Sequence, residues 1–136
     1  MAKTAVVYWS GTGNTEAMAK AVKQGAGVGA ELISASDFGP GDVAKYDCIA
    51  FGCPAMGSEQ LEDSEFAPMF DSVKDQLKGK KIALFGSYDW GDGEWLRTWE
   101  GRVKDGGATL AGSVKAHLEP DDAALSECVA LGAGLA

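Results

Sequence analysis

Residues 9–15 read Trp9-Ser10-Gly11-Thr12-Gly13-Asn14-Thr15, a glycine-containing turn between two segments of regular pattern. The preceding run, residues 4–8, is rich in β-branched and aromatic side chains and predicts a buried strand. The following run, residues 16–23, gathers its apolar side chains on one helical face. Backbone N–H groups converge where such a turn enters a helix, and the helix dipole favours negative charge there. The stretch therefore predicts an anion site.

The side chains of this turn narrow the choice of anion. They are neutral hydrogen-bond donors: Ser10, Thr12, Asn14 and Thr15. No Lys or Arg lies between Lys3 and Lys20, which excludes a Walker A loop. Glu16 occupies the third glycine position of the G-x-G-x-x-G fingerprint, which excludes the dinucleotide motif. The pattern predicts a pocket for one phosphate monoester, and the alternative is an ordinary strand-to-helix turn of small polar residues.

Composition restricts the class of protein and its partners. The chain has 136 residues, of which 46% are hydrophobic and 24% charged, as in a globular protein. Its formal net charge of -8 argues against nucleic acid and anionic membranes and favours a basic partner. We expect one domain over residues 1–136, and a monomer.

The cysteines and the hydropathy of the sequence indicate the cellular compartment of the protein. Cys48, Cys53 and Cys128 include no C-x-x-C pair, so we expect free thiols in a reducing environment. No apolar run approaches the length of a membrane helix, and the N-terminal residues do not resemble a signal peptide. We therefore expect a soluble cytoplasmic protein. His117 is the single histidine and is expected at a strand end, so no metal site is predicted.

Strand and helix patterns alternate five times along the chain. Strands are predicted over residues 3–9, 30–34, 47–53, 81–86 and 108–114, and helices over 14–24, 64–77, 94–105 and from Asp121 or Asp122 to about 134, with a helical turn near 41–45. This alternation predicts an α/β fold, a three-layer doubly wound sandwich around a five-stranded parallel sheet. Ligands bind beyond the C-terminal strand ends in such sheets, so the loops after the first, third and fourth strands are expected to meet.

Two of these loops share an unusual composition. The loops Pro54-Ala55-Met56-Gly57-Ser58-Glu59 and Ser87-Tyr88-Asp89-Trp90-Gly91-Asp92-Gly93 each place a large polarisable side chain among small polar residues. A flat aromatic ligand between Met56 and Trp90 uses both, through sulfur–aromatic contact and stacking. The alternatives are a small local core contact for Met56 and a partly exposed loop aromatic for Trp90.

The three motifs together resemble short-chain flavodoxins of the clostridial type. These motifs are SGTGNT after VVYW, GCPAMGSE, and ALFGSYDWGDGEW, and the match is collinear over essentially the whole chain. The resemblance implies strand order 2-1-3-4-5 and one non-covalent FMN. It also implies a function as a low-potential one-electron carrier that serves redox enzymes, such as ferredoxin-type oxidoreductases and flavodoxin reductases, in place of ferredoxin.

The resemblance also implies roles for individual residues. The cofactor-binding set is Ser10, Gly11, Thr12, Gly13, Asn14, Thr15, Pro54, Ala55, Met56, Gly57, Ser58, Glu59, Ser87, Tyr88, Asp89, Trp90 and Gly91. Met56 is expected on the inner face of the flavin ring and Trp90 on the outer face. Glu59 is expected at the N3 edge, and the Gly57 carbonyl is expected to turn toward N5–H in the one-electron-reduced state. Two residues depart from the family pattern: Asp89 stands where similar proteins usually have Gly, and Pro54 where some offer Ser.

Acidic residues dominate around the second and third motifs. No Lys or Arg lies between Lys45 and Lys74, or between Lys81 and Arg97. The carboxylates in these intervals are Asp47, Glu59, Glu62, Asp63, Glu65, Asp71, Asp89, Asp92 and Glu94. At about 8 Å and an effective dielectric of about 40, one carboxylate disfavours an added negative charge by roughly 1 kcal/mol, or roughly 40 mV. This pattern predicts a shuttle between a neutral semiquinone and an anionic hydroquinone at low potential.

Other function classes fit the sequence less well. A flavin-dependent reductase on the same fold needs an acid or base and a second substrate pocket, and neither is visible. A phosphoacceptor receiver domain needs acidic residues after the first strand, where this chain has Ser10-Gly11-Thr12-Gly13. An activator of another enzyme, built like a flavodoxin, differs only in its partner and stays open.

Overall fold

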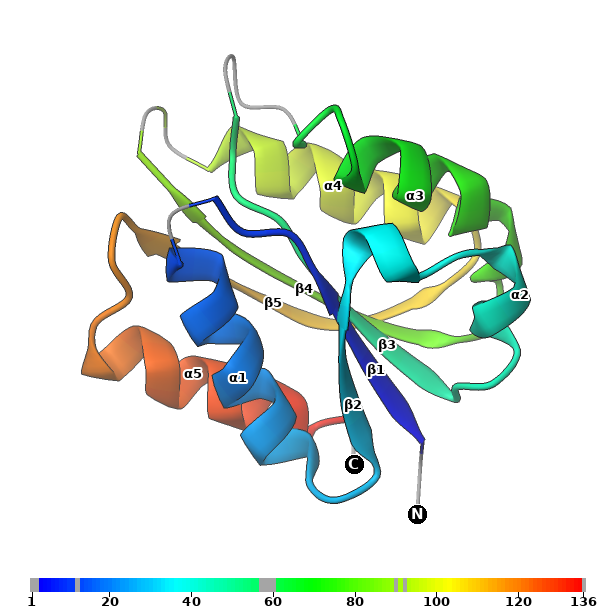
Figure 1. Ribbon diagram of the computed structural model, residues 1–136, viewed down its shortest axis with the longest axis horizontal. Helices are drawn as coiled ribbons and strands as arrows, with labels where there is room; N and C mark the ends of the chain where they lie inside the picture. The colour runs from blue at the N-terminus through cyan, green and yellow to red at the C-terminus, as the bar shows by residue number, and fades with distance from the viewer. Residues whose placement is uncertain (1–2, 12, 57–60, 90, 92, 136) are drawn as a thin grey trace.

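A computed structural model describes residues 3–11, 13–56, 61–89, 91 and 93–135. Its parallel sheet has five strands in the order β2-β1-β3-β4-β5, which confirms the predicted fold class and strand order (Figure 1). The strands are β1 (Thr4–Tyr8), β2 (Ala30–Ser34), β3 (Cys48–Gly52), β4 (Lys81–Tyr88) and β5 (Thr109–His117). Every β-strand beyond the first is preceded by a helical crossover, as parallel pairing requires.

Helices cover both faces of the sheet. Helices α1 (Asn14–Ala26) and α5 (Asp122–Ala133) lie on one face, and α3 (Phe66–Val73) and α4 (Glu94–Asp105) lie on the other (Figure 1). The short α2 (Pro40–Val43) precedes β3. No helix in the described part of the chain is long and apolar enough to cross a membrane.

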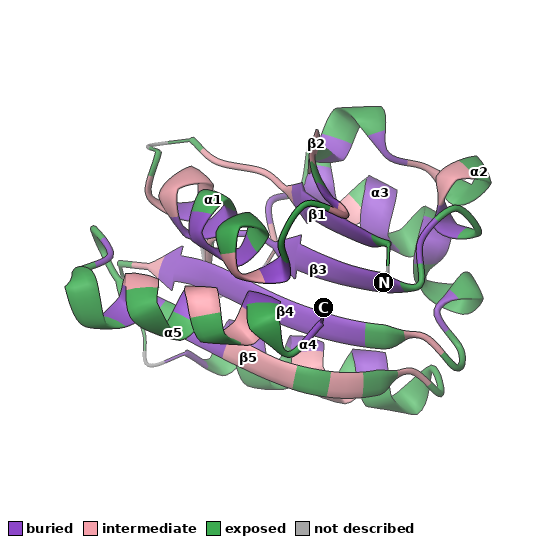
Figure 2. Ribbon diagram, turned by 90° about the horizontal axis from the view of Figure 1, so that it is seen from below, coloured by how far each residue is buried: buried purple, intermediate pink, exposed green. Residues whose placement is uncertain are grey.

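Burial follows from this layering. All five residues of β3 are buried, because helices cover both sides of this central strand, whereas β5 at the sheet edge consists mostly of exposed and intermediate residues (Figure 2). Helices α3 and α4 each bury one face against the sheet. The buried side chains are Phe66, Met69, Phe70, Val73, Trp95, Leu96, Trp99 and Val103, and Leu77 beyond α3 joins them.

Strands β4 and β5 and helix α3 end elsewhere than predicted, and the start of α5, which the sequence left open between Asp121 and Asp122, is defined. Strand β4 extends through Ser87 and Tyr88, which the sequence assigned to a loop, because β5 continues beside it and Tyr88 pairs with His117. Helix α3 is shorter than predicted, since Lys74–Gln76 tighten into a 3₁₀ turn. Asp121 is the cap of α5, and its carboxylate accepts the N–H of Ala124 at 2.8 Å.

Helices α1 and α5 pack at unusually close range. A Cβ built on Gly25 would lie 1.9 Å from the carbonyl oxygen of Val129, and one on Gly132 would lie 2.0 Å from that of Val22. These two glycines therefore let the helix backbones touch. This contact keeps Gly25 inside α1, and the helix ends at Gly27, whose φ of 89° suits glycine.

Candidate functional site

A cavity of about 290 Å³ lies at the C-terminal edge of the sheet, where the predicted loops meet. Its walls come from the end of β4, from the segments that follow β1, β3, β4 and β5, and from the first residue of α1. They are Trp9, Gly11, Asn14, Pro54, Ala55, Met56, Ser87, Tyr88, Asp89 and Leu118. The structure thus brings together eight of the residues that the sequence analysis proposed. Trp9 and Leu118 are additional.

The turn between β1 and α1 is organised by the Ser10 hydroxyl. Its Oγ accepts the backbone N–H of Gly13 at 3.1 Å and that of Glu16 at 3.2 Å. Gly13 has a φ of 97° and caps α1, a backbone conformation that glycine adopts without strain. The hydroxyl hydrogen of Ser10 takes no part in these two bonds and can be donated to an anion. The positive end of the α1 dipole lies at the same place.

Hydrogen bonds connect this turn to the other two loops. Buried Thr15 and Ser87 are joined through their hydroxyl oxygens at 3.3 Å. The N–H of Ala55 donates to the Ser87 carbonyl at 3.0 Å, and the indole N–H of Trp95 donates to the Cys53 carbonyl at 3.2 Å. The bases of the three loops are therefore fixed to one another and to α4.

The two residues that the sequence analysis left out are apolar walls of the cavity. Trp9 donates its indole N–H to Glu65 Oε1 at 3.1 Å, which holds the ring between β1 and the start of α3. Leu118 has a φ of 60° and is 46% exposed, and it is the one non-glycine residue of the described chain with a positive φ. If the fifth strand had been predicted to continue beyond residue 114, Leu118 would have been expected at the same edge of the sheet as the cavity.

Five of the proposed site residues lie outside the described residues. These are Thr12, Gly57, Ser58, Glu59 and Trp90. The neighbouring Met56 is 39% exposed at the cavity, in keeping with a side chain that is not part of the core. Gly91 has a φ of 91°, as a turn glycine does, whereas Asp89 lies outside the positive-φ region. The Asp89 backbone therefore needs no glycine-like conformation.

The acidic residues are less concentrated at the cavity than their sequence positions indicated. Asp47 accepts the N–H of Lys3 at the opposite end of the sheet, and Asp71 pairs with Arg102 at 2.8 Å. Glu65 accepts the hydrogen bond from Trp9. Acidic residues that are close in the sequence thus lie apart in the structure. Among the described residues, Asp89 is the carboxylate that lines the cavity.

Glu62 is not a solvated rim charge either, since it is only 4% exposed. Its carboxylate accepts the backbone N–H groups of Ser64, Glu65 and Phe66, each at 2.8 Å, and also the Ser64 hydroxyl. Burial alone would raise the pKa of Glu62, but these hydrogen bonds outweigh it and hold the pKa below its usual value. Glu62 acts as an anionic cap at the start of α3.

The three cysteines are free and buried, as predicted. Burial raises the pKa of the Cys53 thiol far above its ordinary value, and that of Cys128 to about 12. Both thiols stay protonated at neutral pH and are poor nucleophiles. Among the described residues, no group of three or more His, Cys, Asp and Glu side chains is arranged to hold a metal ion.

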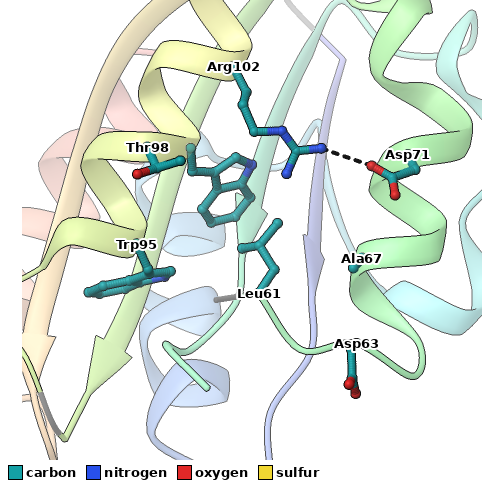
Figure 3. Close-up of a pocket in the computed structure, with 8 residues that line it drawn as sticks. Leu61, Asp63, Ala67, Asp71, Trp95, Thr98 and Arg102 are labelled. Carbon is teal, nitrogen blue, oxygen red and sulfur yellow. Dashed lines mark hydrogen bonds and ion pairs between the residues drawn. The ribbon is translucent and has the colours of Figure 1, made fainter. Parts of the chain in front are cut away.

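A second cavity, of about 300 Å³, lies between α3 and α4 (Figure 3). An ion pair between Arg102 and Asp71 connects the two helices beside it, and Trp95 and Leu61 form apolar walls. The segment before α3 contributes Leu61 and Asp63 to its lining, and a carboxylate there disfavours an anion. Of these two cavities, the first alone combines neutral hydrogen-bond donors at a helix start with thioether and aromatic walls. That combination suits a phosphate that carries a flat heterocycle.

Comparison with known proteins supports this interpretation. The sequence model of the family Flavodoxin matches residues 6–132. A flavodoxin of Megasphaera elsdenii is 50% identical over 130 residues, which cover 93% of each chain. A flavodoxin of Clostridium beijerinckii is 41% identical over 135 residues, which cover 96% of this chain and 97% of the relative.

Solved structures give the same result. The solution structure of two-electron reduced Megasphaera elsdenii flavodoxin superposes with a TM-score of 0.89 at 48% identity, and 97% of each chain is covered. Oxidised flavodoxin 1 from Bacillus cereus superposes with a TM-score of 0.84 at 27% identity, over 97% of this chain and 95% of that one.

Proposed function

The chain belongs to the flavodoxin family and is an FMN-binding electron carrier rather than an enzyme, and from this premise we propose that it cycles between the neutral semiquinone and the anionic hydroquinone of FMN. We propose that it serves redox enzymes in place of ferredoxin. The bound flavin supplies the one-electron chemistry, and the protein binds it, orients it and sets the charge around it. The cavity at the ends of β1, β3 and β4 is the observation that carries this proposal.

The turn at residues 10–15 is the proposed phosphate site. Ser10 has a hydroxyl hydrogen to donate, because its oxygen already accepts two backbone N–H groups, those of Gly13 and Glu16. Thr12 and Asn14 are proposed as further neutral donors, and Thr15 supports the turn through its bond to Ser87. Without a Lys or Arg in the turn, the α1 dipole and these donors carry the whole interaction with the phosphate.

The other end of the cavity is the proposed ring site. Met56, Tyr88, Trp9 and Leu118 offer thioether, aromatic and aliphatic surface there. Met56 is proposed for the inner ring face and Trp90 for the outer face. Gly57 and Glu59 are proposed at the N5 and N3 edges, with Pro54, Ala55, Ser58 and Gly91 completing the two loops.

The charge around the ring site favours a low potential. Asp89 lines the cavity, and a carboxylate there disfavours an added electron by roughly 1 kcal/mol at about 8 Å and an effective dielectric of about 40. Fewer carboxylates act at this site than the sequence suggested, since Asp47, Glu62 and Asp71 are engaged elsewhere. The net charge of -8 still favours docking to basic faces of redox enzymes.

The test begins with the apoprotein and two ligands, FMN and riboflavin. Ser10→Ala removes one hydrogen bond to a phosphate, worth about 1.5–3 kcal/mol, so FMN affinity should fall at least tenfold. Riboflavin lacks the phosphate, and its affinity should change less than threefold. Thr98→Ala, in the cavity between α3 and α4, is the matched control and should change neither affinity.

Anaerobic stepwise reduction of the holoprotein then tests the redox couple. A yellow protein that passes through a blue radical before bleaching supports the proposed cycle. An apoprotein that binds neither ligand, or a reduction in one two-electron step, would contradict it.

A further inference from the structure

Trp9 separates the cofactor cavity from another hollow, which we call the polar cavity. It lines the cavity of about 290 Å³ described above and also one of about 260 Å³. Hydroxyl and carboxylate side chains make up most of the other walls of the polar cavity: Ser10, Glu16, Ser34, Ser36 and Glu65. Ser10 belongs to the turn proposed for the phosphate, so the polar cavity borders the phosphate end of the cofactor cavity.

The Trp9 ring is held in this position from two sides. Its indole N–H donates to Glu65 Oε1 at 3.1 Å, and the N–H of Glu65 donates in turn to Glu62 Oε1 at 2.8 Å. On the other side, a Cβ built on Gly11 would lie only 3.1 Å from Cη2 of Trp9, so the ring packs directly on the backbone of the turn. Trp9 is therefore a fixed wall between the start of α3 and the phosphate turn.

The polar cavity is a poor place for a second phosphate group. Its charged side chains are the carboxylates of Glu16 and Glu65. Lys20 pairs with Glu16 at 3.4 Å and offsets part of its charge, whereas the printed bonds of the Glu65 carboxylate lead to the neutral indole of Trp9. A phosphate on the turn meets backbone N–H groups and hydroxyls, but an anion in the polar cavity meets like charge.

We propose that Trp9 and Glu65 select a flavin that ends in a phosphate monoester, FMN, over a flavin whose phosphate is bonded to a second one, as in FAD. This inference rests on the proposed function. The flavin and its ribityl chain fill the cofactor cavity, so a group on the far side of the phosphate has to extend away from that cavity. Trp9 blocks this path by its bulk, and Glu65 holds Trp9 there and repels the second phosphate.

The primary experiment compares FMN and FAD on the full-length apoprotein, with quenching of flavin fluorescence as the signal. Wild type should bind FMN at least tenfold more tightly than FAD, because FAD has to displace the wall and bring a second phosphate to Glu65. The quantity followed in each variant is the ratio of FAD affinity to FMN affinity. A substitution that only loosens the phosphate turn lowers both affinities together and leaves this ratio unchanged.

Two variants separate the charge from the wall. Glu65→Gln keeps an oxygen that accepts the Trp9 N–H and removes the charge, so the ratio should rise at least threefold; the side chain is exposed and partly screened by solvent, which keeps the effect modest. Trp9→Phe narrows the wall and removes its bond to Glu65, and the ratio should again rise at least threefold. Asp63→Asn removes an exposed carboxylate that lines the other side of α3, and it should leave the ratio unchanged.

The outcomes distinguish this inference from the proposed function. Equal affinities of wild type for FMN and FAD, or a ratio that is unchanged in both variants, would overturn the selection by Trp9 and Glu65 while FMN binding still supports the proposed function. A rise in Trp9→Phe alone would overturn the role of the Glu65 charge. If Trp9→Phe does not fold, the ratio in Glu65→Gln decides. An apoprotein that binds neither flavin would overturn both the inference and the proposed function.

Discussion

Glu62 is predicted to be the main cap at the start of α3, and Glu62→Ala measures its contribution to stability. The variant removes the acceptor of three backbone N–H groups. Ser64 and Glu65 are exposed, so their N–H groups can bond to water, but Phe66 is fully buried and its N–H cannot. One charged hydrogen bond at a buried donor is worth about 1.5–3 kcal/mol, and loss of a helix cap costs about 1 kcal/mol. We expect the free energy of unfolding to fall by about 3 kcal/mol.

The pH dependence of this loss distinguishes a charged cap from a packing contact. Because the folded pKa of Glu62 is lowered, its stabilisation is present above the unfolded value of 4.5 and disappears as the pH falls through the folded pKa. Urea unfolding of wild type and Glu62→Gln between pH 7 and pH 3 should show a difference that shrinks at the acid end. A difference that is constant with pH, or a loss below 0.5 kcal/mol in Glu62→Ala, would refute the assignment. Asp63→Ala, at an exposed neighbour, is the control and should have little effect.

Three further predictions use other parts of the fold. Gly25→Ala places a methyl group 1.9 Å from a carbonyl oxygen of α5 and should lower the free energy of unfolding by about 3 kcal/mol, whereas Gly101→Ala, in an open helical position, should raise it by about 0.5–1 kcal/mol; urea unfolding of the pair measures both. Asp121→Ala removes the α5 cap and should cost about 1 kcal/mol, with Asp122→Ala nearly neutral in the same assay. Asp89→Gly removes a carboxylate at the cavity and should raise the lower of the two midpoint potentials by roughly 40 mV in an anaerobic redox titration, and a downward shift would contradict the electrostatic argument.

The sequence predicted the layers and the convergence of the loops because these depend on patterns that are local, whereas the strand order came from the resemblance to flavodoxins. An apolar run such as residues 48–52 has to be central in a parallel sheet, since it is apolar on both faces. Parallel connections then force the ends of β1, β3 and β4 to one edge. Most of the cavity wall follows from that edge alone.

Contacts between distant segments account for what the sequence missed. Leu118 reaches the cavity because β5 continues alongside β4 to Tyr88, and no local pattern marks that extension. The acidic residues look like one cluster in the sequence, yet Glu62 caps a helix and Asp71 pairs with Arg102. The number of carboxylates that act on the cavity can therefore be counted only after such partners are known.

The hydrogen bonds that hold the cavity walls in place also matter for an electron carrier. Trp9 is held by the Glu65 carboxylate, but the bases of the other loops are tied by bonds between neutral groups: Ala55 N–H to Ser87 carbonyl, Trp95 N–H to Cys53 carbonyl, and Leu118 N–H to Tyr88 carbonyl. Bonds between neutral groups respond little when a charge arrives nearby, so these walls have little reason to move when an electron enters or leaves. Walls that are fixed beforehand present their dipoles without a cost of reorganisation. In the described part of the chain, Asp89 is the carboxylate that lines the cavity, so it acts on the cofactor's charge from a wall that is already fixed.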